Sequence, residues 1–454
     1  MNPNHFFRLK TLVAFEIGRF DKALIKLHAA QYPSAVAHDF IEYLRGELES
    51  QRTAMAEILQ DFPEDPIGAV SRLKSEHRKL QDKLQFLDAI ENARIDEVPW
   101  SLIPTIERYG SKLLSGRRIL TTATTDVNYA IRWYRSPSEG VGSFFTLYTP
   151  KVHRANAFLH ILFGHELFHP ILDEFFDQHT AVVAPTLREG CKRLLSAAGA
   201  ATDLFAPQRL GELVELSLSV WRRGLEELMC DLGCASVFGP AALLSASSLA
   251  LSENLDEPPA PDQFYPPWRL RMRIMLQHSI DTNAGAAALA HAETQLKREG
   301  LQSEWQRLAE AVADIRSLTL DQTDVQNINV NPLLKLAYEA VNGSISDARE
   351  YVQRKAAVLD DRWTETIQQV PSLLRCLETL IPPGELRNPG ARIGQPASSS
   401  AIALAGWVYQ LRHERPGSNS SDVASFKRTC RLMLKAFEDA ELKRRFAETK
   451  SDES

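Results

Sequence analysis

His165, Glu166 and His169 form a His-Glu-x-x-His motif inside an apolar run that spans residues 157–172. On a helix, two histidines four residues apart lie on one face, with their Cβ atoms about 5–6 Å apart. That spacing lets one imidazole nitrogen of each histidine bind a single Zn²⁺, and Glu166 could take a proton from a metal-activated water. Because so short a motif also arises by chance, the alternative is a buried helix with two hydrogen-bonded core histidines.

A second stretch, residues 221–240, could complete such a site. A catalytic zinc site needs three protein ligands and one position open to water. Glu227, on a following helix, is a candidate third ligand, and Asp231 shares its helix face and could fix the tautomer of a ligating histidine. Glu226 is the competing ligand, although Asp231 would then lie on a rotated face. A solvated acidic stripe is the alternative for these carboxylates.

Cys230 and Cys234 flank Asp231 on the same predicted helix. Thiolates bind zinc, but two cysteines with two histidines would make a closed structural site that has no position for water. Glu227 fits an open site better. We therefore predict that both cysteines are small core residues.

The order of these motifs, His-Glu-x-x-His followed after about sixty residues by Glu-x-x-x-Asp, resembles the gluzincin class of zinc metallopeptidases. It looks like an uncharacterised bacterial branch in which the second motif leads into a small-residue helix ending in Gly-Pro-Ala, here residues 239–241. The resemblance extends over residues 119–278, about a third of the chain. It implies the following roles: zinc binding by His165, His169 and Glu227, general base and then general acid catalysis by Glu166, and orientation of a histidine by Asp231.

One residue departs from a regular helical motif. Pro170 directly follows His169, disfavours helical backbone angles at that histidine and removes a backbone donor. The sequence therefore predicts that the helix kinks or ends there.

Further residues of interest lie downstream of the second motif. Gluzincins commonly place a histidine or tyrosine there to stabilise the tetrahedral oxyanion, and Tyr265 and His278 are the candidates in this chain. Arg269, Arg271 and Arg273 could do the same or bind a substrate carboxylate. For the arginines we favour a solvated helix face.

The surrounding elements are predicted from hydrophobic periodicity. Helices account for the first ninety-odd residues, a short helix lies near 105–114, and strands are expected near 127–133 and 144–148. The sheet could pair its edge strand with an extended substrate, or merely cover the motif helix. Beyond residue 284 the pattern predicts further helices, with loops at 381–400 and 415–421: 285–316, 332–357, 362–380, 400–412 and 423–447.

These elements predict an α+β, mostly α-helical fold with a zincin-like catalytic core and a small β-sheet, flanked by helical N- and C-terminal regions. The expected domains are a helical N-terminal region, a zincin-like metallopeptidase core and a helical C-terminal domain: 1–97, 98–283 and 284–454.

Composition is typical of a soluble globular protein, with 44% hydrophobic and 24% charged residues among 454. The net charge of −6, without a dominant basic stripe, argues against nucleic-acid binding. Five scattered cysteines fit a reducing cytoplasm, and residues 1–20 show no long apolar core of a secretory signal. The uncharged stretch 232–252 contains Gly239 and Pro240, which favours a buried helix in two pieces over a membrane span.

The sequence thus predicts a cytoplasmic zinc-dependent peptidase that acts on a peptide or protein substrate, with no nucleic-acid or membrane partner. A protein partner could bind through the C-terminal helical domain. The alternative is a metal-binding regulatory or scaffold protein on a zincin-like fold without peptidase activity. A di-iron carboxylate site is disfavoured because the chain has no second Glu-x-x-His to pair with residues 166–169.

Overall fold

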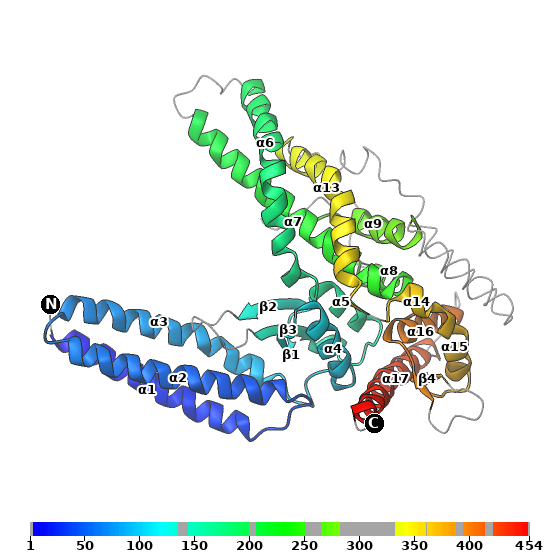
Figure 1. Cartoon of the computed structure of the whole chain (residues 1–454), viewed down its shortest axis with the longest axis horizontal. Helices are drawn as coiled ribbons and strands as arrows, with labels where there is room; N and C mark the ends of the chain where they lie inside the picture. Colours follow the sequence, from blue (N-terminus) through cyan, green and yellow to red (C-terminus); the bar gives the residue numbers. More distant parts are fainter. Residues whose placement is uncertain are drawn as a thin grey trace. The chain divides into compact units, whose positions relative to one another are not determined.

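A computed structural model shows a mostly helical protein with a small sheet, as predicted (Figure 1). It describes residues 3–134, 144–198, 206–250, 265–281, 332–359, 361–386, 394–413 and 421–452. The chain divides into two compact units, the first Met1–Glu107 with Arg117–Arg154 and the second Arg108–Gly116 with Ala155–Ser454. The strands near 118–150 therefore group with the N-terminal helices, whereas the predicted boundaries at 97 and 283 stay a prediction.

Three long helices form most of the first unit: α1 (Pro3–His28), α2 (Val36–Asp61) and α3 (Pro66–Glu91). They lie side by side and enclose a core in which Phe20, Phe40 and Leu44 are fully buried (Figure 1). The predicted helices of the first ninety residues are confirmed. Their apolar positions recur at helical spacing because each helix buries one stripe against the other two.

The first unit also holds a three-stranded sheet in the order β1-β3-β2. Its strands are β1 (Arg118–Thr124), β2 (Ala130–Tyr134) and β3 (Phe144–Pro150), with β1 parallel and β2 antiparallel to β3. The two predicted strands correspond to β2 and β3. The strand β1 was not predicted, because its residues Ile119–Ala123 are buried in succession and show no alternation between faces.

The second unit is built around one long helix, α7 (Ala206–Phe238). It packs against α5 (Phe163–Glu166), α6 (Asp173–Ala197), α8 (Pro240–Leu249), α9 (Trp268–Asp281) and α13 (Pro332–Ala356). Figure 1 shows α7 in green running along α6 and α13. Every element that carries a candidate site residue therefore contacts α7 or is part of it.

Most of the remaining elements belong to the second unit and match most of the predicted C-terminal helices, whereas the turns at Trp100–Leu102 and Lys151–His153 belong to the first unit. The segment predicted at 285–316 lies outside the described residues. Part of the predicted loop at 381–400 is a short two-stranded hairpin. The helices and strands are α4 (Ile103–Leu113), which belongs to both units, α14 (Trp363–Thr366), α15 (Val370–Glu378), β4 (Glu385–Leu386), β5 (Gln395–Pro396), α16 (Ser399–His413) and α17 (Ser421–Asp452). Short 3-10 turns lie at Trp100–Leu102, Lys151–His153, Leu159–Leu162, His169–Ile171 and Ile367–Gln369.

The break between α7 and α8 lies at Gly239, inside the uncharged stretch that the sequence predicted to be a buried helix in two pieces. Gly239 has φ +54° and ψ −128°, a conformation that is open almost only to glycine. Among the described residues, none of the helices combines the length and apolar composition needed to cross a membrane. The described part of the uncharged stretch, residues 232–250, is mostly buried within the second unit.

Gly239→Ala should lower the free energy of unfolding by at least about 2 kcal/mol, because the backbone would be strained. The new Cβ would also lie 2.4 Å from Cδ2 of Trp363. Chemical denaturation followed by circular dichroism measures the change. Gly211→Ala on α7 is the matched control, since nothing lies within 4 Å of its added Cβ, and it should raise stability by about 0.5–1 kcal/mol. Equal stabilities of the two variants would contradict the prediction.

Candidate metal centre

The segment that carries the His-Glu-x-x-His motif is not one regular helix. α5 ends at Glu166, and a 3-10 turn begins at His169, directly before Pro170. The backbone stays right-handed between them, but the amide of Phe168 bonds to the carbonyl of His165 three residues back. The helix therefore ends four residues before Pro170, earlier than predicted, and His169 and Pro170 lie in the 3-10 turn. The two histidines nevertheless remain neighbours, with ring centroids 5.1 Å apart.

Close packing brings this segment against α7. The ring of Phe168 lies on Gly233, where an added Cβ would be only 2.3 Å from Cγ of the ring. Both residues are buried. A larger residue than glycine at position 233 would push the motif segment away from α7, so this contact sets the distance between the histidines and the carboxylates of α7.

His165 lies between two carboxylates of α7. Its Nδ1 is 2.9 Å from Oδ1 of Asp231, and its Nε2 is 3.4 Å from Oε2 of Glu227. All three side chains are buried, with 4–7% of each residue exposed. A neutral imidazole that donates Nδ1–H to Asp231 presents the lone pair of Nε2 toward Glu227. Asp231 thus makes the contact that the sequence analysis expected of it.

His169 lies among three carboxylates, one of which, Glu227, it shares with His165. Its Nδ1 is 2.8 Å from Oε1 of Glu226, whereas its Nε2 is 4.0 Å from Oε1 of Glu227 and 4.0 Å from Oε2 of Glu166. Glu226, the competing third ligand, therefore lies at the nitrogen that faces away from Glu227. Both Nε2 atoms converge on Glu227, and Glu166 lies beside them.

The separations around Glu227 can be compared with those between the ligands of a zinc ion. Two ligands about 2.1 Å from one ion at a tetrahedral angle are about 3.4 Å apart. The separations between Glu227 oxygens and the Nε2 atoms of His165 and His169 are 3.4 and 4.0 Å. Two imidazole nitrogens and one carboxylate also form the donor set of catalytic zinc sites, which leave a fourth position for water.

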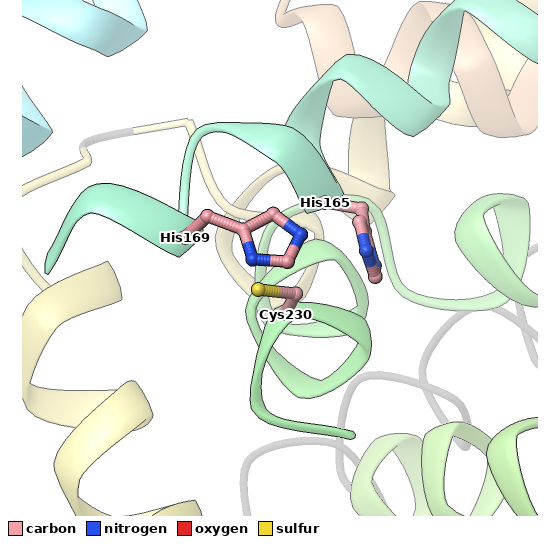
Figure 2. Close-up of side chains that lie close together, drawn as sticks. All are labelled: His165, His169 and Cys230. Carbon is pink, nitrogen blue, oxygen red and sulfur yellow. The ribbon is translucent and has the colours of Figure 1, made fainter. Parts of the chain in front are cut away.

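Cys230 lies at the same place, one turn after Glu227 on α7. One donor atom from each of His165, His169 and Cys230 lies within 4.8 Å of the others (Figure 2). Figure 2 shows its sulfur close to the imidazole of His169. Cys230 and Cys234 are both buried, as predicted for core residues. Cys234 faces the carbonyl of Ile161 at 3.6 Å, so only Cys230 of this pair belongs to the candidate centre.

The charges of the centre depend on one another. Burial acts to lower the pKa of His165, but hydrogen bonds to Asp231 and Glu227 and the charges of these carboxylates raise it from 6.5 to about 10. Burial acts to raise the pKa of Glu227, but its contact with His165 and the nearby positive charges lower it from 4.5 to about 2. Without a metal ion, His165 therefore carries the positive charge between two ionised carboxylates at neutral pH.

Arg271 does not lie on a solvated helix face, so that prediction is wrong. It lies in the first turn of α9, which packs against α7, and only 12% of its side chain is exposed. Its guanidinium forms a two-pronged ion pair with Asp231. The sequence signal was an arginine one turn after Trp268, whose ring lies 4.4 Å from the guanidinium carbon.

The two predicted oxyanion-stabilising residues each form a hydrogen bond with a side chain of α7. The hydroxyl of Tyr265 accepts a hydrogen bond of 2.9 Å from Nη2 of Arg223, which lies one turn before Glu227 on α7. Nε2 of His278 is 2.7 Å from Oγ of Ser236, five residues beyond Asp231 on α7. Burial lowers the pKa of His278 to about 4, with a further contribution from the charge of Arg349, so its imidazole is neutral at neutral pH.

The chain matches no protein-family model, and no curated protein or solved structure matches it significantly. The resemblance to gluzincins therefore depends on the two motifs, and the case for a metal centre depends on the geometry around Glu227.

In metal-free protein, His165 should titrate near pH 10. Because this folded-state pKa lies above the ordinary 6.5, the protonated imidazole stabilises the fold fully below pH 6.5 and loses that contribution as pH rises toward 10. Nitrogen-edited NMR of protein labelled at histidine measures the titration after chelation of metal. His153, whose pKa is lowered by burial, is the internal control. Titration of His165 below pH 7 would contradict the assignment of its two carboxylate partners.

Proposed function

We propose that the chain is a zinc-dependent peptide-bond hydrolase of the cytoplasm. The observation that carries this proposal is the convergence of Nε2 of His165 and Nε2 of His169 on the two carboxylate oxygens of Glu227. Each Nδ1 is held by its own carboxylate, Asp231 or Glu226, which is how protein metal sites orient their histidines.

In this proposal His165, His169 and Glu227 hold the ion. Zinc, when bound, supplies a Lewis acid that makes a water molecule acidic near neutral pH. Glu166 is buried, and its Oε2 lies 4.0 Å from Nε2 of His169, within reach of a water at the fourth ligand position. Its carboxylate takes the proton from the attacking water and returns it to the leaving amine, so that one residue is general base and then general acid.

Stabilisation of the oxyanion is assigned to Tyr265 rather than His278. Because the oxygen of Tyr265 accepts a hydrogen bond from Arg223, its own proton is free to be donated to a substrate oxygen. Arg223, which bonds the hydroxyl of Tyr265, lies one turn before Glu227 on α7. His278 is buried against Ser236 and is seven residues, or about 10 Å along the helix, beyond Arg271.

The proposed substrate is a peptide or protein, and no nucleic acid or membrane is expected to bind. The C-terminal helices beyond residue 332 are proposed as the region through which a protein partner could bind, because no predicted site residue falls on them.

Cys230 favours one alternative, a metal-binding regulatory or scaffold protein without peptidase activity. Its thiol lies with His165 and His169 in the group whose donor atoms are within 4.8 Å of one another. If a thiolate bound the ion together with Glu227, four protein ligands would close the site and exclude water.

Metal analysis by mass spectrometry separates the two ligand sets. Wild-type protein supplied with zinc should carry about one ion per chain, and His165→Ala and Glu227→Ala should lose it, because each removes one of three ligands. Cys230→Ala is the control within α7 and should retain the ion. Loss of zinc from Cys230→Ala as well as from Glu227→Ala would instead support the closed four-ligand site of the regulatory alternative.

Glu166→Gln should retain zinc yet lose peptide hydrolysis by about 10²–10⁴-fold, because the amide cannot accept the proton of the attacking water. Cleavage of a fluorogenic peptide mixture by zinc-loaded protein provides the measurement. Glu174→Gln on α6, an exposed carboxylate that pairs with Lys355, is the matched control and should cleave at the wild-type rate. A zinc-loaded Glu166→Gln variant with full activity would exclude the proposed mechanism.

A further inference from the structure

A two-pronged ion pair joins α9 to the metal centre. Arg271, in the first turn of α9, donates from Nε to Oδ2 of Asp231 at 2.7 Å and from Nη2 to Oδ1 at 2.9 Å. Oδ1 of Asp231 also receives Nδ1–H of His165 at 2.9 Å. The carboxylate that orients His165 is therefore itself held in both distance and plane by a guanidinium, since only a forked donor fixes the plane of its partner.

The same guanidinium reaches the candidate third ligand. Nη2 of Arg271 lies 3.6 Å from Oε2 of Glu227, and this oxygen is 3.4 Å from Nε2 of His165. Arg271 thus contacts both carboxylates that flank His165. A displacement of its guanidinium would alter the two contacts that set the direction in which Nε2 of His165 points.

These contacts matter for the charges of the two carboxylates, because both carboxylates are buried. Asp231 and Glu227 are 4% and 5% exposed, so water does little to stabilise their charges. Burial alone would raise the pKa of Asp231, but the charge of Arg271 and the hydrogen bonds from His165 and Arg271 hold it well below its ordinary value. Trp268 packs its ring against the guanidinium at 4.4 Å, which restricts the motion of that group.

We propose that Arg271 is a positioning residue of the metal centre. It fixes Asp231 and the near oxygen of Glu227, so that His165 presents Nε2 to the ion. This inference rests on the proposed zinc site, but it makes no assumption about the substrate.

Replacement of Arg271 by lysine distinguishes this positioning role from simple compensation of charge. A lysine at position 271 keeps the positive charge but offers a single ammonium group, which cannot form the fork on Asp231. If only charge mattered, Arg271→Lys would bind zinc as the wild type does. If orientation matters, the variant folds yet holds zinc more weakly.

The test measures the zinc dissociation constant of the full chain by competition with a chromogenic chelator. Loss of a partner that orients a metal ligand typically weakens binding about 10–100-fold, and we expect this for Arg271→Lys and Arg271→Gln. Arg222→Gln is the matched control, because that arginine pairs with Asp173 on an exposed part of the surface and should leave affinity unchanged. Melting curves of metal-free protein establish that Arg271→Lys is folded.

Cobalt(II) in place of zinc adds a spectroscopic measurement. Its visible absorption depends on ligand geometry, so Arg271→Lys should shift the bands whereas Arg222→Gln should not. Unchanged zinc affinity and cobalt spectrum in folded Arg271→Lys would overturn the positioning role and leave the proposed function standing. A wild-type protein that binds no zinc would overturn both.

Discussion

The carboxylate of Glu227 is the group on which the rest of the centre depends. It is buried, and a buried carboxylate without partners is very costly. One of its oxygens faces Nε2 of His165 and Nη2 of Arg271, and the other faces Nε2 of His169. In metal-free protein a proton on His165 supplies the positive charge that Glu227 requires. In the proposed zinc site a divalent ion takes the place of that proton, because a histidine must be deprotonated to bind a metal.

The position of α7 explains how carboxylates of one helix contact both histidines. Glu226 and Asp231 are five residues apart, which separates them by about 7.5 Å along the helix axis and by about 140° around it. Each holds one Nδ1, so the two imidazoles are anchored on their outer sides. Glu227 lies between these anchors and meets the inner nitrogens. The close contact of Phe168 with Gly233 keeps the motif segment near enough for all these contacts to form.

Residue spacing predicted the parts of the centre that depend on a single element. The i, i+4 separation of His165 and His169 and that of Glu227 and Asp231 place each pair on one face, whereas the helix ends at Glu166, earlier than Pro170 indicated. Contacts between elements could not be predicted in this way. The fork of Arg271 on Asp231 depends on how α9 packs against α7, a relation that no local pattern encodes. The strand β1 was missed for a related reason, since burial on both faces removes the alternation that reveals a strand.

The electrostatic surroundings distinguish Cys230 from Glu227 in metal-free protein. Cys230 is close enough to the histidines to serve as a ligand, but its thiol must lose a proton before it can bind zinc. Burial raises the pKa of Cys230 well above its ordinary value, and the carboxylates of Glu227, Glu226, Glu166 and Asp231 raise it further. Glu227 is already ionised at neutral pH and binds without that cost. A centre that recruits Glu227 and leaves Cys230 protonated keeps its fourth position for water, and a water beside Glu166 is what peptide hydrolysis requires.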